Sequence, residues 1–296
     1  MYNILYDKRR PSTATEPFTQ SATPAPAPRT LTNYIFKENE NKYDGYYAEI
    51  YNIIHKPENS SHHLDTVIQK TQADHQRSIF LDIDCKTGTF VKYLQERGFE
   101  NTHGVDESQA MVEYCENIHP TINVKQANSN DAIIYEPDLF THIYAINSLF
   151  IYRKKNKQKI IDNIYGWLVN GGYFVLHLID TDGHTTAIAA AAAAATVSGK
   201  CYKSMFSFFN NENQKIKEYV VTTEPETIQP NNISAYLTLI EKIKDDADVT
   251  HEYHETLYIE NIKTIIKYAT NVGFSLVGKI DNAENGLGHY LYIFQK

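Results

Sequence analysis

The stretch SIFLDIDCKTGTF, residues 78–90, decides the fold of this chain. An apolar run ends in an aspartate, and a short polar turn then leads into a helical pattern. A buried strand followed by a tight turn and a helix is the usual arrangement of a nucleotide-type cofactor loop. Three glycines are common in such a turn, but this one has Asp84, Lys86 and Gly88. The stretch therefore predicts a cofactor loop with two unusual side chains.

Strand and helix patterns alternate through the residues around this loop. Strand-like runs predict strands at 78–83, 103–106, 123–127, 142–147 and 173–179. Apolar spacing predicts helices at 88–97, 108–118 and about 155–168, with Asn170-Gly171-Gly172 as the stop of the last one. Strands separated by helices of this length indicate right-handed βαβ units and a parallel sheet. The predicted fold class is therefore α/β and doubly wound.

The composition outside this core gives the domain organisation. Residues 1–32 are rich in Pro, Thr, Ser and Ala, so we expect a disordered tail there. The remaining domain is predicted to begin with a helical lid at 33–75 and a cofactor-binding core at 76–181. A β-rich insertion with an alanine tract follows at 182–255, and a final helix with an antiparallel hairpin closes the chain at 256–296.

Charge and cysteine usage limit the function classes. Hydrophobic residues make up 42% and charged residues 22% of the 296 positions, as in ordinary globular proteins. The net charge of −8 argues against broad nucleic-acid binding, and the basic run at 152–159 is more typical of a solvated helix face. Three separated cysteines favour a reducing compartment, and neither a membrane span nor a signal peptide is predicted. We therefore expect a cytoplasmic protein without membrane contacts.

Polar side chains follow the predicted strands at the edge where ligands of open α/β sheets bind. Asp82 ends the first strand, and Asp106 ends the second at a position where an acid can accept both ribose hydroxyls of a nucleoside. The turns after the second, third and fourth strands add further candidate ligand contacts: Glu107, Met111, Asn128 and Asn147.

In this order the segments resemble the class I S-adenosylmethionine-dependent methyltransferases. "LDIDCKTG" resembles that family's glycine-rich motif, and "GVDESQAM" resembles its ribose-and-adenine segment. These two motifs lie at 81–88 and 104–111. The fourth-strand motif of the family is matched at 140–149 and its fifth-strand motif at 167–180, and the aromatic lid helix that precedes the core is matched at 46–54. The resemblance implies a mostly parallel seven-stranded sheet with a C-terminal antiparallel hairpin, S-adenosylmethionine as cofactor, and methyl transfer to an unidentified small molecule, RNA or protein.

The resemblance also implies roles for individual residues. Asp82 would help to hold the methionine amino group of the cofactor, and Asp106 would bind its ribose. The methionine part would be surrounded by Asp84, Cys85, Lys86, Thr87 and Gly88. Met111 and Asn128 would flank the adenine. Glycine is usual where φ is positive or where a ligand approaches the backbone, so the aspartate and the lysine in this loop are expected to change cofactor affinity in either direction.

The same residues also allow simpler interpretations. Aspartates such as Asp82 and Asp106 also cap helices without binding a ligand. A phosphate-binding G-x-x-x-x-G-K-[ST] loop and a dinucleotide-binding G-x-G-x-x-G loop are both absent. Neither His62-His63 nor "HEYHE" at 251–255 has the spacing of a metal site, so no metal is predicted.

Methyl transfer depends largely on positioning and desolvation, so the sequence nominates no catalytic side chain. The polar groups expected to overhang the cleft are Tyr46, Tyr47, Tyr51, His251 and His254. Loss of two loop glycines favours an alternative function, an inactive methyltransferase-like module that binds a protein partner. A third hypothesis is an RNA substrate bound through the basic run at 153–159.

Overall fold

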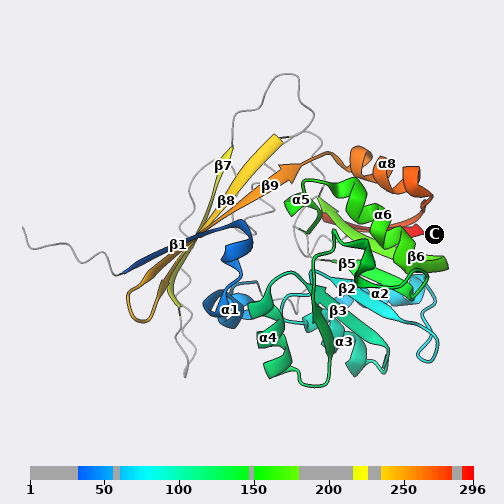
Figure 1. Cartoon of the computed structure of the whole chain (residues 1–296), viewed down its shortest axis with the longest axis horizontal. Coiled ribbons are helices and arrows are strands. Elements are labelled where there is room, and N and C mark those ends of the chain that lie inside the picture. The colour runs from blue at the N-terminus through cyan, green and yellow to red at the C-terminus, as the bar shows by residue number, and fades with distance from the viewer. Residues whose placement is uncertain (1–32, 56–60, 147–149, 180–215, 226–234, 282–288) are drawn as a thin grey trace, which may run out of the picture. The chain divides into compact units, whose positions relative to one another are not determined.

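The computed structural model describes residues 33–55, 61–146, 150–179, 216–225, 235–281 and 289–296 (Figure 1). The predicted tail at 1–32, the alanine tract and Asn147 lie outside these residues. Among the described helices, none has the length and apolarity that crossing a bilayer requires.

The main sheet has seven strands in the order β10-β11-β6-β5-β2-β3-β4. The strands, in chain order, are β2 Phe80–Ile83, β3 Thr102–Asp106, β4 Asn123–Gln126, β5 Phe140–Ala145, β6 Leu168–Ile179, β10 Ser275–Asp281 and β11 His289–Gln295. β2, β3, β4, β5 and β6 pair in parallel, whereas β11 is antiparallel to both β6 and β10. The predicted mostly parallel sheet with a C-terminal hairpin is confirmed.

Helices pack against both faces of this sheet, as the doubly wound prediction requires (Figure 1). They are α1 Gly45–His55, α2 Ser61–Lys70, α3 Thr89–Glu96, α4 Gln109–Ile118, α5 Phe150–Arg153, α6 Lys157–Trp167 and α8 Ile262–Val272, with short 3-10 turns η1 Asn39–Lys42 and η3 Ala132–Ile134. Successive strand residues face opposite sides. Phe80 of β2 accordingly packs in one core cluster with α2 and α3, and Leu81 packs in another with α1, α4, α6 and α8.

One helix boundary in the prediction is wrong. We expected the helix at 155–168 to stop at Asn170-Gly171-Gly172, but α6 ends at Trp167 and β6 begins at once. The two glycines lie inside β6, where the N–H of Gly171 donates to the Lys296 carbonyl and the N–H of Lys296 donates to Gly172. A Cβ at Gly172 would come within 2.9 Å of the Val169 carbonyl oxygen, so close backbone packing explains this glycine better than a helix stop.

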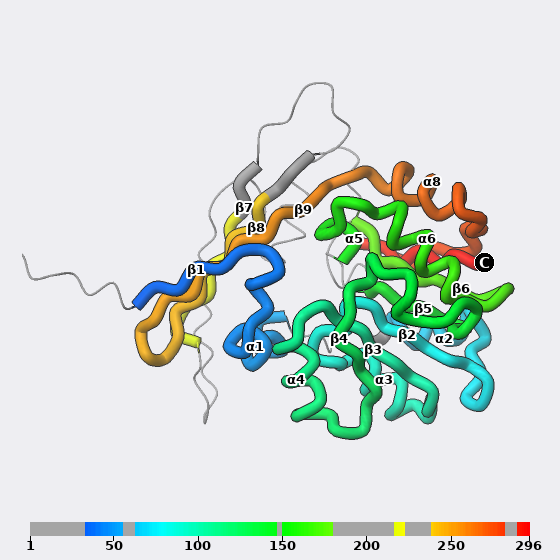
Figure 2. The backbone as a smooth tube through the Cα atoms, viewed as in Figure 1, coloured from blue at the N-terminus to red at the C-terminus, as the bar shows by residue number. Residues whose placement is uncertain are grey.

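A second sheet of four strands stands beside the main one, in the order β1-β9-β8-β7. Its members are β1 Tyr34–Glu38, β7 Ile216–Pro225, β8 Ala235–Asp245 and β9 Thr250–Ile259. The antiparallel pairing of β7, β8 and β9 confirms the β-rich insertion. β1 was not predicted as a strand: it pairs in parallel with β9, more than 200 residues away, and joins the lid to the insertion (Figure 2).

Candidate active site

The loop between β2 and α3 keeps the backbone shape of a glycine-rich turn without its first two glycines. Asp84, Lys86 and Gly88 have φ values of 63°, 52° and 73°, all left-handed. A non-glycine residue in this region is held at a cost of roughly 1–2 kcal/mol. Only Gly88 is fixed by space, because a Cβ there would lie 2.4 Å from Cys115 Sγ.

Asp106, at the end of β3, holds this loop from below. Its Oδ2 accepts the backbone N–H of Lys86 at 2.9 Å, and its Oδ1 accepts the backbone N–H of Ser108 at 2.9 Å. Burial raises the pKa of this carboxyl, and the neighbouring Asp84 charge adds to the rise against the opposing effect of Lys86.

Asp82 lies deeper, within β2. It is 3% exposed, and its Oδ2 has no hydrogen-bond partner among the described residues. Burial raises the pKa of Asp82 well above its usual range, and the charges of Asp84 and Asp106 add to the rise. Asp82 therefore lies beneath the loop and does not line the cavity described next.

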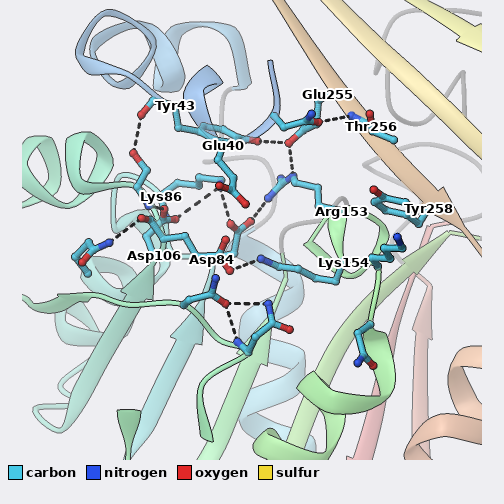
Figure 3. A pocket seen from close by; sticks show the side chains of 18 residues that line it. Glu40, Tyr43, Asp84, Lys86, Asp106, Arg153, Lys154, Glu255, Thr256 and Tyr258 are labelled. Carbon is cyan, nitrogen blue, oxygen red and sulfur yellow. Dashed lines mark hydrogen bonds and ion pairs between the residues drawn. The ribbon is translucent and has the colours of Figure 1, made fainter. Parts of the chain in front are cut away.

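A cavity of about 550 Å³ opens above the carboxyl ends of β2, β3 and β4 (Figure 3). Its inner wall comes from the loop and the strand ends, and its outer wall comes from η1 and β9. The lining residues are Asn39, Glu40, Tyr43, Asp84, Lys86, Asp106, Glu107, Ser108, Gln126, Asn128, Asn130, Arg153, Lys154, Lys155, Asn156, Glu255, Thr256 and Tyr258.

Ion pairs cross one end of this cavity. Lys86 Nζ lies 2.6 Å from Asp84 Oδ1 and 3.6 Å from Asp106 Oδ2. Arg153 Nη1 lies 2.6 Å from Asp84 Oδ2, and Arg153 Nε lies 2.9 Å from Glu255 Oε1 (Figure 3). Burial opposes ionisation of Asp84, but the charges of Arg153 and Lys86 outweigh it and lower the pKa of this carboxyl.

The same network continues into the second sheet through Lys42. This buried ammonium pairs with Glu241 and lies 3.2 Å from Glu255 Oε2, while the Tyr47 hydroxyl donates to Glu241 at 2.9 Å. Burial alone would raise the pKa values of both glutamates. Lys42 and the groups around it together outweigh burial, with His55 and Tyr219 contributing at Glu241 and Arg153 at Glu255, and each pKa is lowered to about 2.

The structure brings only some of the predicted site residues to the cavity. Those that line it are Asp84, Lys86, Asp106, Glu107 and Asn128. The Asn128 Oδ1 accepts the backbone N–H of Asn130 at 2.8 Å. Those that do not line it are Asp82, Cys85, Thr87, Gly88 and Met111. Met111 is fully buried in the core, and Thr87 donates to Asn52 of α1 at 2.7 Å.

The five polar groups expected to overhang the cleft do not line the cavity. Tyr46 stacks on His251 with ring centroids 3.9 Å apart, and His254 bonds to Glu252 at 2.7 Å, all within the lid and the second sheet. Tyr43 and Tyr258 line the cavity in their place. In the part of the chain that is described, no group of three or more His, Cys, Asp or Glu side chains could hold a metal ion.

The basic run contributes to the site instead of forming a solvated face. Arg153 and Lys154 line the cavity, where Lys154 pairs with Glu107. Lys157 is 2% exposed and donates to the Tyr258 carbonyl at 2.8 Å. Of the five cations in the run, Lys155 and Lys159 are exposed, so the expected solvated face is wrong for the other three.

The comparisons with known proteins agree with the methyltransferase-like fold that the sequence predicts. Residues 80–172 match a family model described as a methyltransferase domain. No curated protein matches the sequence. The fold is similar to CcbJ methyltransferase from Streptomyces caelestis, with 13% identity, a TM-score of 0.61, and coverage of 87% of this chain and 98% of that one.

Two further solved structures share the fold. One is a S-adenosylmethionine-dependent methyltransferase from Clostridium acetobutylicum, with 16% identity, a TM-score of 0.59, and coverage of 84% of this chain and 97% of that one. The other is SAM-bound CalS10, an amino pentose methyltransferase from Micromonospora echinaspora, with 12% identity, a TM-score of 0.54, and coverage of 79% and 89%.

Proposed function

Since residues 80–172 form a class I S-adenosylmethionine-dependent methyltransferase domain, we propose that the chain methylates a small molecule that carries an amine. The observation that carries the proposal is the cavity at the carboxyl ends of the parallel strands, walled on its outer side by η1 and β9. That is the edge at which open α/β sheets bind their ligands.

The cofactor is S-adenosylmethionine, and the residues present fit it most clearly at the adenosine end. Asp106 lines the cavity and can accept ribose hydroxyls, and Gln126, Asn128 and Asn130 offer amides beside it. The volume of about 550 Å³ lies within the usual range for small-ligand sites. At the other end the loop keeps its left-handed turn, but Asp84 and Lys86 add side chains to it.

When bound, the cofactor supplies a methyl group on a positively charged sulfur, which the acceptor lone pair takes while neutral S-adenosylhomocysteine is released. The contribution of the protein is to position the acceptor and to exclude water. Tyr43 and Glu255 from the lid and the second sheet make a fixed wall, because the Tyr43 hydroxyl donates to Glu255 Oε1 at 2.9 Å. Burial opposes ionisation of Glu255, but Lys42 and Arg153 lower its pKa to about 2, so this carboxylate is a weak base.

An amine acceptor suits this wall. An unprotonated amine already carries the lone pair that takes the methyl group, so it needs no strong base from the protein, and the product is a methylammonium ion. The exposed carboxylate of Glu40, on the outer wall, can attract the protonated form as it arrives, and this form loses its proton to bulk water before it reacts. Amino sugars are the first class to test, because one protein of similar fold is an amino pentose methyltransferase.

The test is transfer of tritium from methyl-labelled S-adenosylmethionine to a panel of acceptors. The panel contains amino sugars, the same sugars with hydroxyls in place of the amines, RNA and protein. We expect label only in the amine-bearing small molecules, and we expect Glu40→Gln to raise the KM for the amine. Label in RNA or protein alone would contradict the small-molecule proposal.

A second candidate function is a non-catalytic binding module. The observation that favours it is the ion-paired side chains of Asp84, Lys86 and Arg153 inside the cavity. Such a module would give no heat on titration with S-adenosylhomocysteine at millimolar concentration, whereas the enzyme would bind it.

A further inference from the structure

Aromatic side chains form one stripe along α1, because Tyr47, Tyr51 and His55 are spaced four residues apart. The ring centroids of Tyr51 and His55 lie 4.5 Å apart. At its other end the stripe joins the cavity wall, since the Tyr43 ring packs edge-on against Tyr47 with centroids 5.4 Å apart. His55 itself does not line the cavity, and it is exposed.

The last turn of α1 lies against the cofactor loop. Thr87 Oγ1 donates to Asn52 Oδ1 at 2.7 Å, and Asn52 is three residues before His55. Burial raises the pKa of the Tyr51 hydroxyl, and the nearby charge of Asp84 adds to the rise. The loop therefore contacts the cavity through Asp84 and the end of α1 through Thr87. A ligand atom bound at His55 would lie beside the loop and outside the cavity that fits adenosine.

The hydrogen bonds behind His55 determine which of its ring nitrogens carries the proton. Tyr47 Oη lies 2.9 Å from Glu241 Oε2 and 3.0 Å from His55 Nε2. Burial opposes ionisation of Glu241, but Lys42 and the groups around it lower its pKa to about 2, so this carboxylate only accepts. The single hydroxyl proton of Tyr47 therefore goes to Glu241, and Tyr47 Oη accepts the N–H of His55 Nε2. The lone pair of the ring is then on Nδ1.

This lone pair is available to a ligand. No group in the described part of the chain bonds to His55 Nδ1. The protein around the ring desolvates it in part and lowers the pKa of His55, against the opposing charge of Glu241. The ring is therefore neutral at pH 7, and a neutral imidazole nitrogen accepts a hydrogen bond from an N–H group.

We propose that His55 binds the reacting nitrogen of the methyl acceptor, with Nδ1 accepting one of its N–H groups. The inference rests on the proposed function and adds a named residue to its acceptor side. The acceptor lone pair forms the new C–N bond while the C–S bond breaks and its electron pair stays on the sulfur. Positive charge develops on the nitrogen in this step, so its N–H donates more strongly to Nδ1 in the transition state than in the ground state.

Two consequences follow for the acceptor. The methylammonium product keeps its protons until it reaches bulk water, because a neutral imidazole is a weaker base than an alkyl amine. Primary and secondary amines have an N–H group for Nδ1, whereas a tertiary amine has none. Tyr47 and Glu241 are positioning residues in this arrangement, since they act on the acceptor only through the tautomer of His55.

The experiment compares two substitutions that each keep one of the two nitrogen positions of His55. The amide of asparagine can place its oxygen near the Nδ1 position, whereas the amide of glutamine reaches the Nε2 position and Tyr47. The probe is the amino sugar that takes most label in the acceptor panel. His55→Gln should lower kcat for it at least about tenfold, and His55→Asn should retain more activity than His55→Gln. The Kd for S-adenosylhomocysteine should stay within about threefold in both variants, because His55 does not line the cavity.

The tautomer is measured separately, by long-range 1H–15N NMR of the histidine rings. We expect His55 to be the Nε2–H tautomer in the wild type. Tyr47→Phe removes the acceptor of this N–H and should populate the Nδ1–H tautomer. Tyr219→Phe is the matched control, because Tyr219 also donates to Glu241 but makes no bond to His55.

Three outcomes would overturn the inference and leave the proposed function intact: a kcat of His55→Gln equal to that of the wild type, His55→Gln more active than His55→Asn, or a wild type with the proton of His55 on Nδ1. The second is the order that a purely structural partner of Tyr47 would give. A wild type that labels no acceptor in the panel overturns the proposed function and the inference with it. If Tyr47→Phe does not fold, the wild-type tautomer and the two variants of the exposed His55 decide the matter.

Discussion

Arg153 Nη1 lies 2.6 Å from Asp84 Oδ2, so the short helix α5 is tied directly to the cofactor loop. The same guanidinium pairs with Glu255 of β9 at 2.9 Å. One side chain thus connects the main sheet, the loop and the second sheet. The Glu255 side chain is buried and the Asp84 side chain is only 10% exposed, so removal of the arginine leaves both charges without this partner in a medium of low dielectric.

Replacing Arg153 by methionine should therefore destabilise the chain by about 3–5 kcal/mol, the usual cost of breaking a buried ion pair. The measurement is urea unfolding followed by circular dichroism. Arg97→Met is the matched control, because Arg97 pairs with Asp65 at a half-exposed surface site and its loss should cost at most about 1 kcal/mol. Equal losses in the two variants would contradict a structural role for the Arg153 bridge.

Stability should fall in acid through Glu241 and Glu255. Although burial alone opposes their ionisation, Lys42 and its neighbours hold both folded-state pKa values near 2, below the ordinary value of 4.5. Because each pKa is lower in the folded chain than in the unfolded chain, the ionised carboxylate stabilises the fold when the pH is above the ordinary pKa of about 4.5. This contribution is lost as the pH falls from about 4.5 to about 2. The loss is at most about 3 kcal/mol for each carboxyl.

The check is the free energy of unfolding of the wild type and of Glu241→Gln between pH 2 and pH 6. The glutamine variant should be less stable at pH 6 and show a flatter acid slope. Asp82 and Asp106, whose pKa values are raised mainly by burial, have the opposite dependence and reduce the total slope. An unchanged slope in Glu241→Gln would mean that this carboxyl does not control acid unfolding.

Asp106→Asn should weaken binding of S-adenosylhomocysteine at least about tenfold, because the charged acceptor for the ribose hydroxyls is lost. Asp84→Gly restores the residue that suits a φ of 63° and should keep the Kd of the same neutral ligand within about threefold. Calorimetry measures both values. A greater loss of affinity in Asp84→Gly than in Asp106→Asn would show that the ligand does not bind at Asp106 on the end of β3.

Gly88→Ala should cost about 2–4 kcal/mol, since the new Cβ would meet Cys115 and Ile122 at 2.4 Å and 2.5 Å and the φ of 73° disfavours any side chain. Gly166→Ala in α6 is the control, because a Cβ there meets nothing within 4 Å and alanine favours a helix. Thermal unfolding of both variants tests this. A Gly88→Ala protein as stable as the wild type would show that the loop can rearrange.

The sequence predicts the α/β core well because its signals are local. The stretch from β2 to α4 carries strand and helix patterns within short windows, and these windows form a parallel sheet with helices on both faces. The position of Asp106 at a strand end follows from the same patterns. The final hairpin of β10 and β11 was also visible, because two alternating runs flank a turn-rich segment.

The rest of the site depends on contacts that no local pattern contains. Arg153 and Glu255 are about a hundred positions apart, and β1 pairs with a strand more than 200 positions later. Tyr43 was missed because it precedes the amphipathic helix that the spacing predicted. The available signal was the basic run, whose first cation, Arg153, ends the short helix α5 that follows β5.

The most direct test of the account is a crystal structure of the chain with S-adenosylhomocysteine. We predict that the ribose hydroxyls bond to Asp106 and that the adenine lies beside Asn128. A structure grown at millimolar ligand would contradict the account if it showed the cavity without an adenosyl group and the contacts of Lys86 with Asp84 and Asp106 unchanged.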